Sequence, residues 1–314
     1  MRVAVFGSGA VGGYFGGRLA QAGEDVWFIA RGPHLDAIRE RGLRVTSVEG
    51  DFLVRPASVT DEPSALGAVD VVLLGVKAWQ VPQAAQAMRP LVGAQTFIVP
   101  LQNGIEAPEC LVDVFGASHV LGGLCRIIAY VEAPGHIRHV GAAPYIAFGE
   151  LDASTSGRAE ALRQAFSKAR GLVAEIAPEI RVAMWSKFLF ITALSGVGAL
   201  TRVPFGVMRS QPESRRLLRQ ALEEIFAVAT GNGIALPADS VEQTLGYIDT
   251  LPAEGTASMQ RDIIQGRPSE LEAQVGAVVR LGERVGLAVP LHRVIHAALL
   301  PLERKARGEI EFTI

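Results

Sequence analysis

The sequence predicts an α/β protein in which a Rossmann-type, doubly wound parallel sheet is followed by an all-helical C-terminal domain. Short runs of β-branched and apolar residues, typical of strands buried on both faces, alternate with helical segments as far as Pro178. Beyond Pro178 the hydrophobic period is helical throughout. We therefore expect a first domain over residues 1–178 and a helical second domain over residues 179–314.

The chain opens with a strand and a glycine-rich turn. Arg2 to Phe6 is apolar at nearly every position, and Gly7, Gly9 and Gly12 follow it at the start of a helical segment. This is G-x-G-x-x-G between a strand and a helix, a pattern typical of dinucleotide binding. Gly7 permits a tight turn, Gly9 lets the backbone approach a pyrophosphate, and Gly12 lets helix and strand pack closely. The alternative is a β-turn-α unit without a ligand. We expect the pyrophosphate at the helix N-terminus, in a loop formed by Gly7, Ser8, Gly9, Ala10, Val11 and Gly12.

The second predicted strand, Asp25 to Ala30, ends where NAD and NADP are distinguished. An Asp or Glu at this position would hydrogen bond to the ribose 2′-hydroxyl of NAD. Arg31 holds the position instead, and a guanidinium suits a 2′-phosphate. Glu24 lies at the other end of the strand. We therefore expect NADPH/NADP as the cofactor, the alternative being that Arg31 is only a surface residue.

Polar residues also follow two later predicted strands, Val69 to Val76 and Phe97 to Leu101. Lys77 comes directly after the first, and Asn103 follows the second at a distance of two residues. Ligands of open α/β sheets bind outside the carboxyl ends of the strands. We therefore expect Lys77 and Asn103 at the rim of the cofactor crevice, although either one alone could be a solvated loop residue.

The remaining elements follow from the same patterns. His136 and His139 fall on one predicted strand and could suggest a metal pair, but no third ligand is near, so we expect surface histidines and no metal site. In the first domain we predict helices over 34–41 and 154–169, and strands within 43–59, 120–131, 137–148 and 172–176. In the second domain we predict helices over 179–201, 213–230, 238–247, 258–265, 269–285 and 291–308.

Composition excludes several classes of function. The 314 residues are 49% hydrophobic and 20% charged, and the net charge of −2 gives no support for nucleic-acid or anionic-membrane binding. No apolar run reaches the roughly 18 residues that a membrane span needs. Cys110 and Cys125 have neither metal-binding nor redox spacing, which favours a reducing compartment. We expect a cytoplasmic protein with no nucleic-acid or membrane partner.

Three residues of the helical half could carry chemistry, each with a plainer explanation beside it. Lys187 lies among large apolar residues, so it either extends to solvent or sits in a partly dry cleft where a lysine can donate a proton. Glu270 is in the first turn of a predicted helix, where a carboxylate is favourable in any case. Ser258 starts another helix and could be only a cap. From spacing alone, none of the three is a convincing site.

Five segments and one further residue together indicate a family. They are Gly7 to Gly12, Val76 to Gln80, Leu101 to Gly104, Trp185 to Lys187 and Thr256 to Asp262, followed by Glu270. In this order they resemble the ketopantoate reductase (2-dehydropantoate 2-reductase) family over essentially the whole chain. The resemblance implies a Rossmann domain, a helical domain and an active site in the cleft between them. It also implies reduction of ketopantoate to pantoate with NADPH, a step of pantothenate and coenzyme A synthesis.

The resemblance also implies roles for individual residues. Lys187 would be the general acid that protonates the new alkoxide, and Ser258 would bind the substrate acid. Asn103 would contact both nicotinamide and substrate, and Lys77 would hold the cofactor and help to orient the substrate. The further cofactor contacts implied are Glu270, beside the ribose and Lys187, and Ala129, on the nicotinamide side.

The chain departs from the family pattern where the substrate would bind. Typical members carry asparagines four and eight residues after the catalytic lysine and a third further along. Here Ile191, Ser195 and Phe205 hold those positions, which makes the pocket less polar, with Ser195 as the remaining substrate contact. Hydrogen bonds to a substrate hydroxyl or carboxylate discriminate strongly between substrates. The substrate is therefore ketopantoate or a bulkier, more apolar 2-keto or 3-hydroxy acid.

Two broader alternatives stay open at this point. A non-catalytic NADP-sensing protein would keep the Rossmann domain, but it would need none of Lys187, Ser258 and Glu270, so their presence argues against it. A homodimer would explain the long apolar helical faces, and core packing explains them equally well.

Overall fold

The computed structural model describes residues 1–313 and divides into two compact units. Unit 1 contains residues 1–102 and 107–181, and unit 2 contains residues 103–106 and 182–313. The sequence analysis assigns the segment Asn103–Glu106 to the first domain, and this differs from the structure. The segment clusters with the helices because Ile105 is buried in the helical core and Glu106 forms an ion pair with Arg280.

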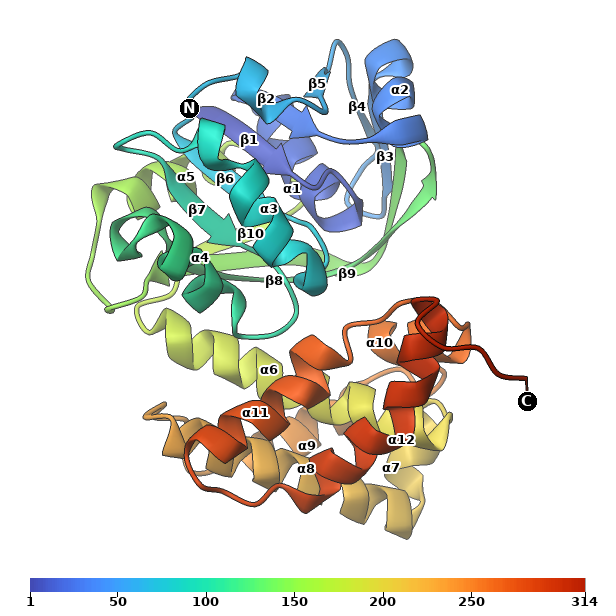
Figure 1. Ribbon diagram of the computed structural model, residues 1–314. Coiled ribbons are helices and arrows are strands. Elements are labelled where there is room, and N and C mark those ends of the chain that lie inside the picture. The colour runs from blue at the N-terminus through green and yellow to red at the C-terminus, as the bar shows by residue number, and fades with distance from the viewer. Residues whose placement is uncertain (314) are drawn as a thin grey trace. The chain divides into compact units, whose positions relative to one another are not determined.

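Unit 1 contains a five-stranded sheet with the order β5-β2-β1-β6-β7, in which every neighbouring pair is parallel. The chain builds outward from β1 in both directions, so the predicted doubly wound, Rossmann-type sheet is confirmed. Figure 1 shows β1, β6 and β7 side by side within this unit. The strands are β1 Arg2–Phe6, β2 Asp25–Ile29, β5 Ser58–Thr60, β6 Val71–Leu74 and β7 Phe97–Pro100.

A second, mixed sheet completes unit 1. Its order is β10-β9-β3-β4, and β8 pairs with β9 in a long antiparallel hairpin. Strands β3, β4 and β5 follow one another closely in the sequence but belong to different sheets. β3 and β4 are part of this mixed sheet, whereas β5 is part of the parallel sheet. The strands are β3 Leu43–Ser47, β4 Phe52–Val54, β8 Leu121–Ala133, β9 His136–Glu150 and β10 Val173–Ile176.

Helix α1 (Ala10–Gln21) is sandwiched between the two sheets, and its glycines permit this. A Cβ at Gly16 would lie 2.4 Å from Val5 of the parallel sheet. A Cβ at Gly13 would lie 2.2 Å from Ile137 of the mixed sheet. The other helices of unit 1 are α2 Gly32–Arg41, α3 Val81–Ala87, α4 Ala107–Phe115 and α5 Gly157–Ser167, with 3₁₀ turns η1 Pro63–Ala65, η2 Ala78–Gln80, η3 Arg89–Leu91 and η4 Ala117–His119.

The expectation of two surface histidines is wrong for His139. Its side chain is buried beside Tyr14, with 5.1 Å between ring centroids, and its Nδ1 lies 2.8 Å from Ser47 Oγ. His136 is half-buried and hydrogen bonds to Thr46 Oγ1. Strand β3 supplies one partner to each ring, and the second nitrogen of the buried His139 ring, Nε2, lies 3.1 Å from Ala142 O, which is why a histidine is tolerated inside the sheet.

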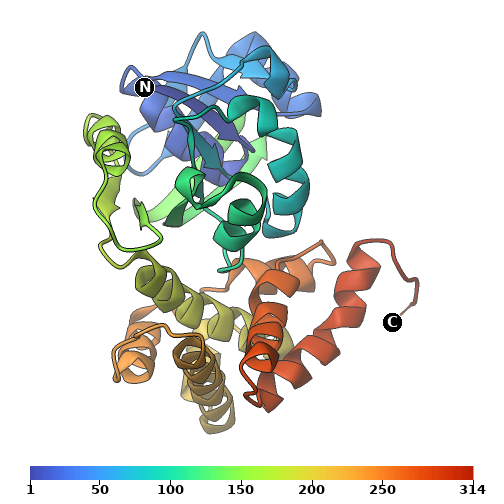
Figure 2. The same ribbon diagram turned by 60° about the vertical axis from the view of Figure 1, so that its left-hand side comes forward.

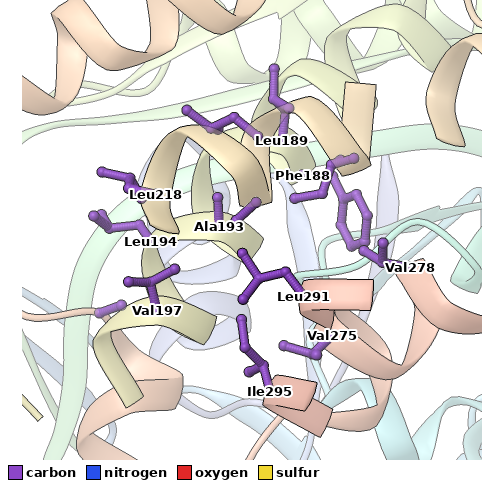
Figure 3. Close-up of a cluster of buried hydrophobic side chains, with 14 of the residues drawn as sticks. Phe188, Leu189, Ala193, Leu194, Val197, Leu218, Val275, Val278, Leu291 and Ile295 are labelled. Atoms are coloured by element: carbon purple, nitrogen blue, oxygen red, sulfur yellow. The ribbon is translucent and has the colours of Figure 1, made fainter. Parts of the chain in front are cut away.

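Unit 2 is helical, as predicted, and is built around α6. Side chains of α6, α8, α12 and the segment 275–278 meet in one buried cluster, which Figure 3 shows with Phe188, Leu194 and Ile295 among its members. Figure 2 shows α12 as one continuous helix that leads to the C-terminal tail. The elements are α6 Ile180–Thr201, α7 Phe205–Ser210, α8 Pro212–Gly231, α9 Ser240–Thr250, α10 Ser258–Ile264, the π-helical turn η5 Glu272–Gly276, α11 Ala277–Arg284 and α12 Pro290–Ala306.

The sequence analysis expects no apolar run long enough to span a membrane, but helix α6 meets that criterion. By length and composition alone, its 22 residues would be enough to cross a membrane. Most of this helix is buried inside the structure, however, including every residue from 192 to 199. The apolar side chains of α6 therefore form the core of unit 2.

Candidate functional site

The glycine-rich turn after β1 has one glycine that the fold itself does not require. A Cβ at Gly12 would lie 2.2 Å from the carbonyl oxygen of Gly7, and Gly7 has a φ of +96°, so both positions need glycine for the fold. A Cβ at Gly9 would meet nothing within 4 Å, and the φ of Gly9 is −69°. The space beside Gly9 is therefore open, in the position where a pyrophosphate would approach the backbone.

The N-terminus of α1 suits an anion. Gly9 is the N-cap residue and offers no side chain, and the first turn of the helix contains no acidic residue. Gly13 N–H makes the first backbone bond, to Gly9 O, so the N–H groups of Ala10, Val11 and Gly12 precede the helical ladder. Unpaired N–H groups and the helix dipole both favour a bound phosphate.

Ser8 and His34 hold this loop in place. The Ser8 hydroxyl points into the fold, where it donates to Ile29 O at 3.0 Å, and the Ser8 N–H donates to the same carbonyl at 3.3 Å, so Ser8 anchors the loop to the end of β2. His34 Nδ1 accepts the N–H of Gly135, which requires that Nε2 carries the proton donated to Ser8 O at 2.8 Å. His34 therefore ties the loop to the β8–β9 turn, and no sequence pattern indicates this role.

Arg31 lies directly after β2 and is the N-cap residue of α2. Its side chain is exposed, and its guanidinium makes no ion pair with any residue from 1 to 313. Such a guanidinium is able to bind a 2′-phosphate without first breaking an internal contact.

Lys77 and Gln102 lie beyond the carboxyl ends of β6 and β7. Lys77 is exposed, with its Nζ 5.8 Å from the centroid of the Trp79 ring. Gln102 is buried, and its Nε2 donates to the carbonyl oxygens of Leu74 and Val76. Gln102 thereby fixes the ends of both strands, a function that the sequence analysis does not assign to it. Ala129, on β8, is half-buried and lies opposite His139 in the strand register.

Asn103 and Glu270 come together within unit 2. The side-chain Nδ2 of Asn103 donates to Glu270 Oε2 at 3.0 Å, and Glu270 is 6% exposed. Next to this pair, a Cβ at Gly104 would lie 2.8 Å from Ala273 O. The segment after β7 is thus held against the turn that carries Glu270.

Lys187 is half-buried on α6 between Trp185 and Phe188, which are both buried. Among residues 1–313, none forms a hydrogen bond or ion pair with the Lys187 ammonium. Ile191 and Ser195 follow at intervals of four residues and share its face of the helix. Ile191 is half-buried, whereas Ser195 is completely buried and its Oγ has no partner among the described residues.

Ser258 is half-buried and is the first residue of α10. The N-cap residue is Ala257, whose N–H donates to Gln260 Oε1 at 3.2 Å, so capping does not account for Ser258. Phe205 is buried against the loop that precedes this helix, because its N–H donates to Gly255 O and a Cβ at Gly255 would lie 2.7 Å from its ring. The structure therefore places Phe205 beneath the segment that leads to Ser258.

The described part of the chain contains no group of three or more His, Cys, Asp or Glu side chains that could hold a metal ion. The polar groups described above are the Lys187 ammonium, the Asn103 amide, the Ser258 hydroxyl and the backbone N–H groups at the start of α1.

Comparison with known proteins extends over nearly the whole chain. The family model described as ketopantoate reductase PanE/ApbA matches residues 3–153, and the model of its C-terminal domain matches residues 179–303. A 2-dehydropantoate 2-reductase of Mesorhizobium japonicum is 31% identical over 98% of this chain and 98% of its own. A PanE/ApbA family ketopantoate reductase from Ralstonia eutropha JMP134 superposes with a TM-score of 0.89 at 32% identity, covering 98% of this chain and 100% of that one. A D-mandelate dehydrogenase shares the fold, with a TM-score of 0.87 at 22% identity over 98% of this chain and 100% of its own.

Proposed function

The chain belongs to the ketopantoate reductase family of oxidoreductases, and from this we propose that it catalyses the NADPH-dependent reduction of a 2-keto acid. Ketopantoate is the first candidate substrate, and pantoate is its product. The observation that carries the proposal is the half-buried Lys187 ammonium, which has no ion-pair partner among residues 1–313. A cationic group with no internal partner is available to neutralise charge on a substrate.

The residues of the glycine-rich turn fit a dinucleotide. The open space beside Gly9 and the acid-free N-terminus of α1 suit a pyrophosphate, and Arg31 suits the 2′-phosphate of NADPH. Bound NADPH supplies hydride to the ketone carbon. We assign Gly7, Ser8, Gly9, Ala10, Val11, Gly12, Arg31, Lys77, Asn103, Ala129 and Glu270 to cofactor binding.

The remaining steps fall to side chains of unit 2. Lys187 donates its proton to the ketone oxygen as negative charge develops there. Asn103, oriented by Glu270, presents its amide to the substrate, and Ser258 binds the substrate carboxylate through its hydroxyl. The family resemblance gives Lys77 the further role of helping to orient the substrate.

Purified protein with ketopantoate and NADPH tests this proposal through the fall in nicotinamide absorbance. We expect turnover, and we expect Lys187→Ala to lower kcat about a hundredfold or more, because a general acid contributes roughly 10²–10⁴. Lys305→Ala, which removes an exposed lysine of α12, is the matched control and should leave kcat unchanged. Near-normal kcat in Lys187→Ala would refute the acid role.

A second candidate substrate is a more apolar 2-keto or 3-hydroxy acid. Ile191 offers no hydrogen bond, Ser195 is completely buried, and Phe205 is packed beneath the α10 loop. A panel of ketopantoate, aliphatic 2-keto acids and phenyl-substituted 2-keto acids distinguishes the two candidates by kcat/KM. If a bulkier acid is preferred, Ile191→Asn should shift the preference back toward ketopantoate, because it adds a hydrogen-bonding group.

A further inference from the structure

A buried carboxylate on α12 holds the residue that precedes Glu270. Glu303 is 2% exposed, and both of its oxygens accept the Ser269 N–H at 3.0 Å. Its Oε2 also accepts the Ser269 hydroxyl proton at 2.6 Å. Glu303 thus makes three hydrogen bonds to a residue 34 positions earlier in the chain.

Arg307, four residues after Glu303, contacts both Glu303 and Ser269. Its Nη2 lies 2.6 Å from Glu303 Oε1 and donates to Ser269 O at 3.1 Å. The Ser269 Oγ in turn accepts the N–H of Leu271. The N–H, the carbonyl and the hydroxyl of Ser269 are therefore all fixed, and the peptide that leads into Glu270 has little freedom.

A second contact from α12 holds the other side of Glu270. His296, seven residues before Glu303 and on the same helical face, lies with its Nε2 2.8 Å from Glu272 Oε1. The hydrogen bond from His296 keeps the pKa of Glu272 below its ordinary value, so this carboxylate is charged at neutral pH. Glu272 opens the π-helical turn η5, and such turns are frequent at functional sites.

Helix capping alone does not explain why a carboxylate is buried at position 303. A buried carboxylate is costly to desolvate, and the Ser269 hydroxyl already caps the Leu271 N–H without help from Glu303. The residue that follows Ser269 is Glu270, whose Oε2 accepts a hydrogen bond from Asn103 Nδ2 at 3.0 Å and therefore has to be placed accurately. A displacement of about 1 Å between two groups of an active site can lower the reaction rate about a hundredfold.

We propose that Glu303 is a positioning residue for the reaction, acting through Ser269 to aim Glu270 at Asn103. This inference rests on the proposed function, in which Asn103 and Glu270 serve the cofactor and substrate. In this proposal Glu303 itself contacts neither the cofactor nor the substrate. Its removal should reorient the Asn103 amide even when the protein stays folded.

The test compares Glu303→Gln with Glu224→Gln in the full-length protein. Glu224 is also a buried glutamate that caps a helix start from another helix, since it accepts the N–H groups of Leu291 and His292. We expect Glu303→Gln to lower kcat/KM about tenfold in the otherwise native protein, and less than about twofold in an Asn103→Ala background. Glu224→Gln should lower the melting temperature without this coupling. An equal loss in both backgrounds, or an equal loss in both glutamate variants, would overturn the proposal.

A readout without turnover separates this proposal from the proposed function. The NMR signal of the Asn103 side-chain amide, assigned with Asn103→Ala, should move in Glu303→Gln toward its position in Glu270→Gln. It should stay in place in Glu224→Gln. An unmoved signal in Glu303→Gln refutes the positioning role whatever the activity, whereas full activity in Asn103→Ala refutes the proposed function and leaves the NMR result to decide the positioning. Should Glu303→Gln fail to fold, Ser269→Ala removes only the hydroxyl contact and is read in the same way.

Discussion

Asn103 and Glu270 are separated by 167 positions in the sequence and joined by a 3.0 Å hydrogen bond from Nδ2 to Oε2. The bond occupies one N–H of the amide and so determines which end of it faces Glu270. The carbonyl oxygen of the same amide has no partner among residues 1–313. The bond to Glu270 therefore gives the Asn103 amide a defined orientation, which the role proposed for Asn103 in cofactor and substrate binding requires.

Replacing Gly9 by alanine should separate cofactor binding from folding. A Cβ there meets nothing within 4 Å, so we expect a stability change below about 1 kcal/mol. The same methyl group occupies the space proposed for the pyrophosphate, and we expect the Kd for NADPH to rise about tenfold or more. Thermal unfolding and fluorescence titration measure the two effects. Gly12→Ala is the contrasting variant and should be strongly destabilised, because its Cβ would lie 2.2 Å from Gly7 O. Unchanged NADPH affinity in Gly9→Ala would contradict the loop assignment.

Arg31→Ala should change the preference between the two nicotinamide cofactors. The side chain is exposed and makes no ion pair within the described chain, so its loss should leave the fold intact. We expect the KM for NADPH to rise about tenfold or more, because a charge-assisted contact with the 2′-phosphate is lost, while the KM for NADH changes little. Steady-state kinetics with both cofactors measure this. Arg41→Ala, an exposed arginine at the other end of α2, is the control. Equal effects on both cofactors would refute the 2′-phosphate role.

His34→Ala should loosen the glycine-rich turn. The ring bridges Ser8 O and the Gly135 N–H, so both backbone groups would lose their partner. We expect about 1–3 kcal/mol of destabilisation and a several-fold higher KM for NADPH, with the KM for the keto acid nearly unchanged. Denaturant unfolding and steady-state kinetics measure the two. An increase in the keto-acid KM of the same size would argue against a role confined to the turn.

Glu224 should make the stability of unit 2 depend on pH. Burial would raise its pKa, but the hydrogen bonds from the His292 side chain and from the Leu291 and His292 N–H groups outweigh this and hold the pKa below the ordinary value of 4.5. A carboxyl group with a lowered pKa stabilises the folded state above its unfolded pKa and loses that contribution as pH falls through its folded pKa. We therefore expect the free energy of unfolding of the wild type to be about 1–3 kcal/mol higher than that of Glu224→Gln at pH 7. This difference should shrink as the pH falls below about 4.5.

Urea unfolding of wild type and Glu224→Gln across this pH range measures the difference. Glu223→Gln, at an exposed neighbouring position on α8, is the control. A difference that is constant between pH 7 and pH 3 would show that the charge of Glu224 is not responsible.

Local pattern was sufficient to predict the parallel sheet except for its edge strand β5, which the sequence analysis grouped with the strand segments of residues 43–59. The strands β1, β2, β6 and β7 are short apolar runs whose burial on both faces leaves a signal in consecutive residues, and Gly7 to Gly12 mark the turn after β1. The helices of unit 2 could be predicted for a similar reason, because Leu271, Val275 and Val278 repeat at helical spacing and are all buried.

Contacts between distant parts of the chain could not be predicted. His139 was expected on the surface, because nothing near it in sequence indicates the Ser47 hydroxyl that accommodates it within the sheet. Glu303 carries no local signal at all, since its partner Ser269 lies 34 residues earlier. The roles assigned to Lys187 and Ser258 came from resemblance, and the structure adds only their surroundings. Polar side chains depend on partners that fold topology supplies, and single-sequence periodicity carries no information on topology.

The segment Asn103–Glu106 has a consequence for synthesis of the chain. It is translated in the middle of unit 1, yet its partners Glu270 and Arg280 emerge 167 and 174 residues later. At roughly 5–20 residues per second, these four residues wait on the order of ten to thirty seconds on the ribosome before their partners exist. Residues 1–181, which include all of unit 1, are therefore translated before these partners of the segment exist. Ile105, buried only once the helices have assembled, is the residue that a chaperone would find exposed in the meantime.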